Sequence, residues 1–235
     1  MNIDLTILET LNSFVADKGF WFHALSALGN NPLLRGAPVF ASLVMVSISE
    51  PSTRVKSQIL LGLFGTSLAL VVSVWCQTHL HLHLRPVFDD RLNIIDVEEW
   101  AISKNKWGER LYSLPSDTAT AYFSIGTIVF LQRKVLGLFC FSWIFLTVGI
   151  GRVALGIHYP SDILAGFFLG FSLAYVFTNL KMPQTFLIGL MQRYDVKNYV
   201  YVTFICLFSA EAYSLFPGFQ GIYFSLKQLL GKYVW

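Results

Sequence analysis

The sequence predicts an all-α fold, a polytopic membrane helical bundle of about six transmembrane spans with interfacial helices at both ends of the chain. Two observations predict it. The 235 residues are 54% hydrophobic and only 13% charged, which leaves too little charge to cover a soluble domain of this length. Apolar stretches also recur along the chain, and their lengths are close to the ~20 residues that a helix needs to cross a bilayer. We therefore expect residues 1–235 to form a single integral membrane domain.

The second span, at about 57–80, is the clearest, because no charged side chain lies between Lys56 and Arg85. Residues 4–29 are expected to form one or two amphipathic helices at the membrane interface, and the tail 218–235 the same. Part of the long loop that follows the second span, 96–112, is expected to lie over the membrane as an amphipathic helix. The remaining spans are predicted at about 33–50, 116–133, 135–153, 160–180 and 198–217.

The loops between these spans fall into two sets of opposite charge. Loops joining spans one to two, three to four and five to six hold seven basic residues against two acidic ones. Loops 81–117 and 152–162 hold six basic residues against eight acidic ones. Because basic loops stay on the cytoplasmic side, the acidic set is expected to face outward, toward the periplasm or exterior of a bacterial inner membrane. The net charge is only +3 and the basic residues are scattered, so they form no basic stripe. This excludes a nucleic-acid partner.

Three short polar segments lie at the outer ends of spans. His-Leu-Arg-Pro (83–86) ends the second span, Leu-Pro-Ser-Asp-Thr-Ala (114–119) opens the third, and residues 151–162 join the fourth to the fifth. The predicted topology puts all three on one face of the membrane. This common location predicts a functional site there.

The third segment carries the chemistry. Pro160 suits the first turn of a helix, which puts His158 just before that helix and Asp162 in its first turn. A carboxylate four residues after an imidazole can hold one ring nitrogen and leave the other free as a nucleophile or base. The planar fork of Arg152 suits phosphate oxygens, and Ser116 is an N-cap candidate at a helix start that favours an anion. Together, these four residues predict phosphoryl-transfer chemistry.

With these residues the sequence resembles the type 2 phosphatidic acid phosphatase family of integral membrane lipid phosphatases. Its signature is Lys, six residues, Arg-Pro; then Pro-Ser-Gly-His; then Ser-Arg, five residues, His, three residues, Asp. Arg85-Pro86, Pro115-Ser116 and Arg152, His158 and Asp162 match it in order and spacing, and the resemblance covers about 57–180. It implies a covalent mechanism without metal or other cofactor. His158 would attack phosphorus, Asp162 would orient it, and Arg85, Ser116 and Arg152 would bind the phosphate oxygens.

The sequence departs from the family pattern at four positions: Thr78 stands for the Lys, Asp117 for the Gly, Thr118 for the second His, and Gly151 for the Ser. The lost histidine is the family's general acid, and losing such a group costs about 10²–10⁴-fold. That cost shrinks when the leaving group is stable as an anion, so we hypothesise a lipid diphosphate substrate, such as polyprenyl diphosphate. Auxiliary candidates near the departures are Asp117, Thr118, His79 and His83.

Other interpretations stay open at this stage. A metal site at His79, His81 and His83 is disfavoured, because on a helix His81 points away from the other two. A phosphotransferase would pass the phosphoryl or a phospho-headgroup to a sugar or lipid acceptor. A third hypothesis is a non-catalytic lipid-phosphate binder or transporter. All three functions imply a lipid phosphate and membrane lipids as partners, and the sequence does not indicate an oligomeric state.

Overall fold

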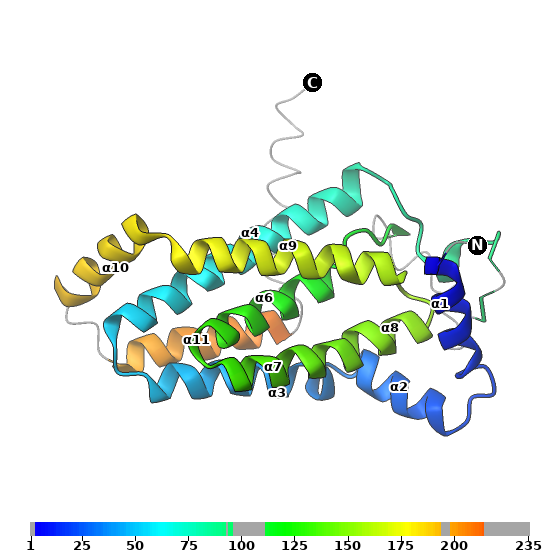
Figure 1. The fold of residues 1–235 in the computed structure, drawn as a ribbon, viewed down its shortest axis with the longest axis horizontal. Coiled ribbons are helices and arrows are strands. Elements are labelled where there is room, and N and C mark those ends of the chain that lie inside the picture. Colours follow the sequence, from blue (N-terminus) through cyan, green and yellow to red (C-terminus); the bar gives the residue numbers. More distant parts are fainter. Residues whose placement is uncertain (1–2, 93, 96–110, 194–197, 214–235) are drawn as a thin grey trace.

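The structure, a computed structural model, describes residues 3–92, 94–95, 111–193 and 198–213. Helices make up most of this part of the chain (Figure 1). The β pairing recorded within it is a single isolated bridge between Leu84 and Tyr112. The predicted fold class, an all-helical membrane bundle, is confirmed.

Each predicted span coincides with a helix, but the predicted count of six spans is not confirmed. Within the described ranges, three segments are long and apolar enough to cross a membrane: α4, the continuous run from α7 through η4 to α8, and α9. A fourth results if α2 and α3, bent by 45° at their junction, count as one span. The helices at the predicted spans are α3 (Pro32–Ser49), α4 (Thr53–His79), α6 (Asp117–Gln132), α7 (Lys134–Ile144) with η4 (Phe145–Ile150) and α8 (Gly151–Ala154), α9 (Pro160–Asn179) and α11 (Asn198–Tyr213).

The short helix α6 explains part of this difference. Its 16 residues extend about 24 Å at ~1.5 Å per residue, less than the ~30 Å of a bilayer's hydrocarbon core. Residues Asp117–Val129 of α6 are buried, and the helix packs against α4, α7, α9 and α3. A helix enclosed by its neighbours in this way is short without exposing polar backbone to lipid.

The N-terminal region forms two helices, α1 (Ile3–Ser13) and α2 (Phe20–Asn30), as the sequence predicts for residues 4–29. Both pack against α8, and the backbones of Gly29 and Gly151 approach closely where α2 crosses it. The sequence did not predict α10 (Lys181–Arg193), which lies in a segment expected to be a loop. The expected tail helix 218–235, and 96–112 apart from its last two residues, lie outside the described residues.

Glycines in α9 bring this helix close to the N-terminal end of α6. A Cβ on Gly170 of α9 would lie 2.3 Å from the carbonyl oxygen of Thr120, and one on Gly166 would lie 2.7 Å from that of Ser116. Only residues without a side chain permit this approach between two helix backbones. The contact continues to the helix starts, where the Ser116 N–H donates to the Asp162 carbonyl at 3.0 Å.

The described parts of the two predicted sets of loops lie at opposite ends of the bundle (Figure 1). The loops before α4 and α7 lie at one end with α10, and α1, α2 and α8 lie at the other. The loop after α4, the start of α6 and the turn between α8 and α9 therefore share the end nearest α1.

Candidate active site

Backbone hydrogen bonds join the three polar segments to one another. The Arg85 N–H donates to the Leu111 carbonyl at 2.9 Å, and the Ser113 N–H donates to the His83 carbonyl at 2.8 Å. The Val87 N–H donates to the carbonyl of Gly156 at 2.9 Å. Gly156 has a φ of 70°, a left-handed conformation that glycine adopts without strain and that turns the chain toward His158. The three segments predicted to meet do meet.

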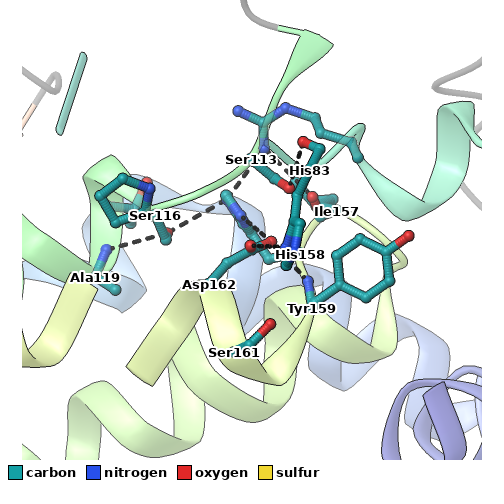
Figure 2. Close-up of polar contacts among 12 residues, drawn as sticks. His83, Ser113, Ser116, Ala119, Ile157, His158, Tyr159, Ser161 and Asp162 are labelled. Atoms are coloured by element: carbon teal, nitrogen blue, oxygen red, sulfur yellow. Dashed lines mark hydrogen bonds and ion pairs between the residues drawn. The ribbon is translucent and has the colours of Figure 1, made fainter. Parts of the chain in front are cut away.

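His158 lies at the centre of this cluster and is fully buried (Figure 2). Its Nε2 lies 3.1 Å from Nη1 of Arg85 and 3.3 Å from Oγ of Ser116. Because a guanidinium group only donates hydrogen bonds, Nε2 must accept, and the ring proton resides on Nδ1. Burial, and next the charge of Arg85, lower the pKa of His158 to about 4. The imidazole is therefore neutral near pH 7, with a lone pair at Nε2.

Asp162 faces the opposite edge of the same ring (Figure 2). Its Oδ2 lies 3.5 Å from Nδ1 of His158 and accepts a hydrogen bond from the Tyr159 N–H at 2.9 Å. The first distance is long for a hydrogen bond, and Nδ1 has no other partner among the described residues. The predicted His–Asp pair is therefore present as a loose contact, with the carboxylate fixed by the first turn of α9.

Two of the predicted phosphate-binding residues contact the imidazole directly. Arg85 is 2% exposed and also donates from Nη1 to the Ile157 carbonyl at 3.3 Å. Ser116 caps α6, as predicted, with Oγ accepting from the Ala119 N–H at 3.3 Å. The positive end of the α6 dipole and the guanidinium group of Arg85 favour an anion beside Nε2.

Arg152, the third predicted phosphate-binding residue, is also buried, and its charge acts on His158. Its Nε has no hydrogen-bond partner in the described part of the chain. A buried guanidinium N–H without an acceptor is costly, and an anion with several oxygens would satisfy it. The arrangement of His158, Arg85, Ser116 and Arg152 thus fits a bound phosphoryl group.

Comparison with known proteins agrees with this arrangement. A model of the PAP2 superfamily matches residues 59–186. The chain is a member of the PAP2 superfamily. It is also similar to the bacitracin transport permease protein BcrC of Bacillus licheniformis, with 45% identity over 60 residues. That match covers 25% of this chain and 28% of the relative, little more than a quarter of its length. No solved structure matches the chain.

The matched PAP2 region contains Arg85, Ser116, Arg152, His158 and Asp162, which the structure gathers at one end of the bundle. Together with the apolar helices, membership identifies an integral membrane protein. The family resemblance inferred from the sequence motifs is confirmed.

Arg35, outside the PAP2 match, was missed by the sequence reasoning. It lies in the first turns of α3, is 4% exposed, and its charge acts on Arg152. Its Nη1 donates to the Gly29 carbonyl at 2.8 Å, its Nε approaches the Tyr122 hydroxyl at 3.5 Å, and its guanidinium group lies 5.5 Å from the Tyr122 ring centre. The available signal was a charge inside a predicted span, which is costly and often functional.

The auxiliary candidates divide into two groups. Asp117 is buried, its charge acts on Arg152, and its Oδ1 accepts from Thr118 N–H at 2.7 Å and Oγ1 at 3.3 Å. His83 reaches the site, because its Nδ1 lies 3.2 Å from Oδ1 of Asp162. His79 instead stacks on Trp75 at the exposed end of α4. Among the described residues, no three His, Cys, Asp or Glu side chains gather as metal ligands would.

Proposed function

We propose that this protein is a membrane lipid phosphatase that removes phosphate from a lipid diphosphate, such as a polyprenyl diphosphate, at the outer face of the membrane. One observation carries the proposal: the neutral, buried His158 presents its Nε2 lone pair between Arg85 and Ser116. A nucleophile with phosphate-binding groups on both sides suits covalent phosphoryl transfer.

In the proposed first step, Nε2 of His158 attacks the terminal phosphorus. The bond from phosphorus to the bridging oxygen breaks, and its electron pair leaves with the lipid monophosphate. In the structure, Nη1 of Arg85 contacts Nε2. In the proposed complex, this Nη1 donates to a phosphate oxygen instead, and the other phosphate oxygens bind Arg152 and the Ser116 hydroxyl. The proton on Nδ1 of His158 stays toward Asp162, whose charge stabilises the phosphorylated imidazole.

In the second step, the oxygen of a water molecule attacks phosphorus and the N–P bond breaks. The electron pair of the N–P bond returns to Nε2, and inorganic phosphate leaves. The protons of the attacking water are divided between phosphate and solvent according to the pH. Neither step requires a metal ion, because the guanidinium groups supply the positive charge. Metal independence is therefore part of the proposal.

Two features favour a diphosphate over a monoester. At the position of the family's acid histidine, the hydroxyl of Thr118 is buried and donates to Asp117, so it is not a strong acid for a lipid alkoxide. A lipid monophosphate leaves as a stable anion and needs less protonation. The additional buried charge of Arg35 beside Arg152 also suits a ligand with a second phosphate.

The test uses purified protein in detergent, with polyprenyl diphosphate, polyprenyl monophosphate and a plain phosphomonoester as substrates. We expect phosphate release to be fastest from the diphosphate and absent from His158→Ala, and acid-labile label to be trapped on wild type alone. Faster release from a monoester contradicts the diphosphate proposal. Turnover by His158→Ala contradicts the covalent mechanism.

The same assay separates the alternative functions. Label recovered on a sugar or a second lipid, without free phosphate, indicates a phosphotransferase. Lipid diphosphate binding that is equal in wild type and His158→Ala, with no turnover by either, indicates a binder or transporter.

A further inference from the structure

Asp162 lies between two imidazole rings. Its Oδ2 faces Nδ1 of His158 at 3.5 Å, and its Oδ1 lies 3.2 Å from Nδ1 of His83. The auxiliary histidine is therefore the closer of the two (Figure 2). Since an ionised carboxylate only accepts hydrogen bonds, Nδ1 of His83 must carry a proton.

The position of His83 is fixed by its surroundings. Its carbonyl accepts hydrogen bonds from the Ser113 N–H at 2.8 Å and from Ser113 Oγ at 3.1 Å. Its ring packs edge-on against Tyr159, with ring centres 5.4 Å apart. These contacts orient the His83 ring toward Asp162 without depending on the hydrogen bond to Asp162.

The two imidazoles differ in their access to solvent. His158 is fully buried, whereas the His83 side chain is 38% exposed. His83 lines a cavity of about 400 Å³ at the end of the bundle, together with Asp4, Asp89, Arg91 and Tyr159. Solvent can therefore protonate His83 directly. Through Asp162, this protonation affects the His158 ring, which solvent does not reach.

We propose that His83 is a positioning residue, which holds Asp162 beside His158 and whose protonation state sets how much negative charge Asp162 presents to the nucleophile. The inference rests on the phosphatase proposed above and adds how its nucleophile is controlled. Neutral His83 donates one hydrogen bond and leaves the charge of Asp162 available to Nδ1 of His158. Cationic His83 neutralises that charge, so Nε2 becomes a weaker nucleophile and the phosphorylated imidazole is less stabilised.

The charged groups around His83 set the pH of this change. Asp162 of α9 faces it directly, and Asp4 of α1 adds a second negative charge. Across the cavity, Asp89 and Arg91 form an ion pair at 2.7 Å that largely cancels itself, and the Tyr159 hydroxyl, whose pKa is raised to about 12 chiefly by burial, stays neutral. The hydrogen bond to Asp162 raises the pKa of His83 above its usual 6.5, despite partial burial.

The sign of the pH dependence follows. Above its raised pKa, His83 is neutral and the reaction is fast. Below it, His83 is cationic and the reaction slows, well before His158 itself protonates near its pKa of about 4. Wild type should therefore lose kcat/KM as the pH falls through a value above 6.5.

The first experiment measures kcat and KM for the lipid diphosphate against pH. His83→Gln keeps a hydrogen-bond donor without a titrating group, so we expect its fall in activity to move to distinctly lower pH. His83→Ala should lose about tenfold in kcat at high pH, the scale for an outer hydrogen-bond partner of a histidine. KM should change little in either variant, because His83 is not proposed to touch phosphate. His81→Gln, in the same segment with its ring against Tyr112, is the matched control.

A His83→Gln variant with the wild-type pH profile overturns the inference, and so does His83→Gln that is inactive at every pH despite a normal fold. A second measurement requires no turnover: nitrogen NMR of the imidazoles in substrate-free protein. We expect the His158 signals to shift as His83 titrates, and the His83 midpoint to fall in Asp162→Asn. Independent titration of the two rings contradicts the linkage. Linked titration in a protein without turnover would leave the linkage standing and reject the phosphatase.

Discussion

The two ends of the bundle contain similar residue types in opposite environments. At the end near α1, Arg35, Arg85 and Arg152 are each less than a tenth exposed, and the charges of Arg85 and Arg152 act on His158. At the end near α10, Arg133 is 56% exposed and pairs with Glu50 across the α3 and α6 ends, while Lys134, Lys181 and Arg193 are exposed. An exposed cation keeps its hydration, whereas a buried one must be compensated by partners or a ligand. The difference supports the binding site proposed at one end, whereas the other end is a solvated surface.

The helix starts differ in the same way. At the site end, α6 begins with the Ser116 side chain capping its backbone and α9 begins with Asp162 accepting from the Tyr159 N–H. At the opposite end, α7 begins at Arg133 with no side-chain cap. At the site end, the starts of α6 and α9 direct the positive ends of two helix dipoles toward the place where an anion would bind. The following predictions test this contrast.

The largest expected effect is that of His158→Ala. Removing the proposed nucleophile should lower phosphate release from polyprenyl diphosphate by about 10⁴-fold or more, the scale for lost nucleophiles in hydrolases. The matched control is Arg133→Ala at the opposite end, which should stay within about twofold of wild type, because an exposed group there plays no part in positioning the phosphate. If both variants lose activity equally, the contrast between the ends is wrong.

Substitution of Arg152 should have the next largest effect. Arg152→Lys keeps a positive charge but loses the planar fork, so we expect kcat/KM to fall about 10²-fold through lost transition-state contacts. Lys181→Ala, which removes an exposed charge, is the control. Unchanged kinetics in Arg152→Lys would show that its unpaired Nε does not bind phosphate oxygens.

Much of the site could be predicted from the sequence, because its information is local. The spacing of His158, Pro160 and Asp162 sets the first turn of α9, and the alternation of loops places the three segments at one end. Local patterns also located the helices at the six predicted spans, although not α10. The six-span count is not confirmed, in part because α6 is short and enclosed, a property of packing that hydropathy does not report.

The roles that the sequence did not assign depend on tertiary contacts. The charge of Arg35 acts on Arg152 because α2, which bends into α3, crosses α8 at Gly29 and Gly151. His83 reaches Asp162 because hydrogen bonds from Ser113 and Val87 fix the path of its loop. Neither interaction has a sequence spacing that would predict it, since the partners are 117 and 79 residues away, respectively.

Arg35→Gln tests whether the buried charge at the site end serves a second phosphate. We expect kcat/KM for the diphosphate to fall about tenfold, or 1.4 kcal/mol, with a much smaller change for the monophosphate. A structural role alone, through the Gly29 carbonyl, would lower both substrates together and reduce thermal stability. The ratio of the two kcat/KM values in the variant distinguishes the two roles.

The smallest effect is expected at the solvated end, where Glu50→Gln removes the ion pair with Arg133. Because Arg133 is more than half exposed, water screens the pair and the variant should lose less than about 1 kcal/mol of stability. Thermal denaturation in detergent measures this, and phosphate release should not change. A large drop in midpoint would mean that this pair locks the ends of α3 and α6 together. Buried and exposed charges would then both be structural in this bundle, and burial alone would no longer single out the site.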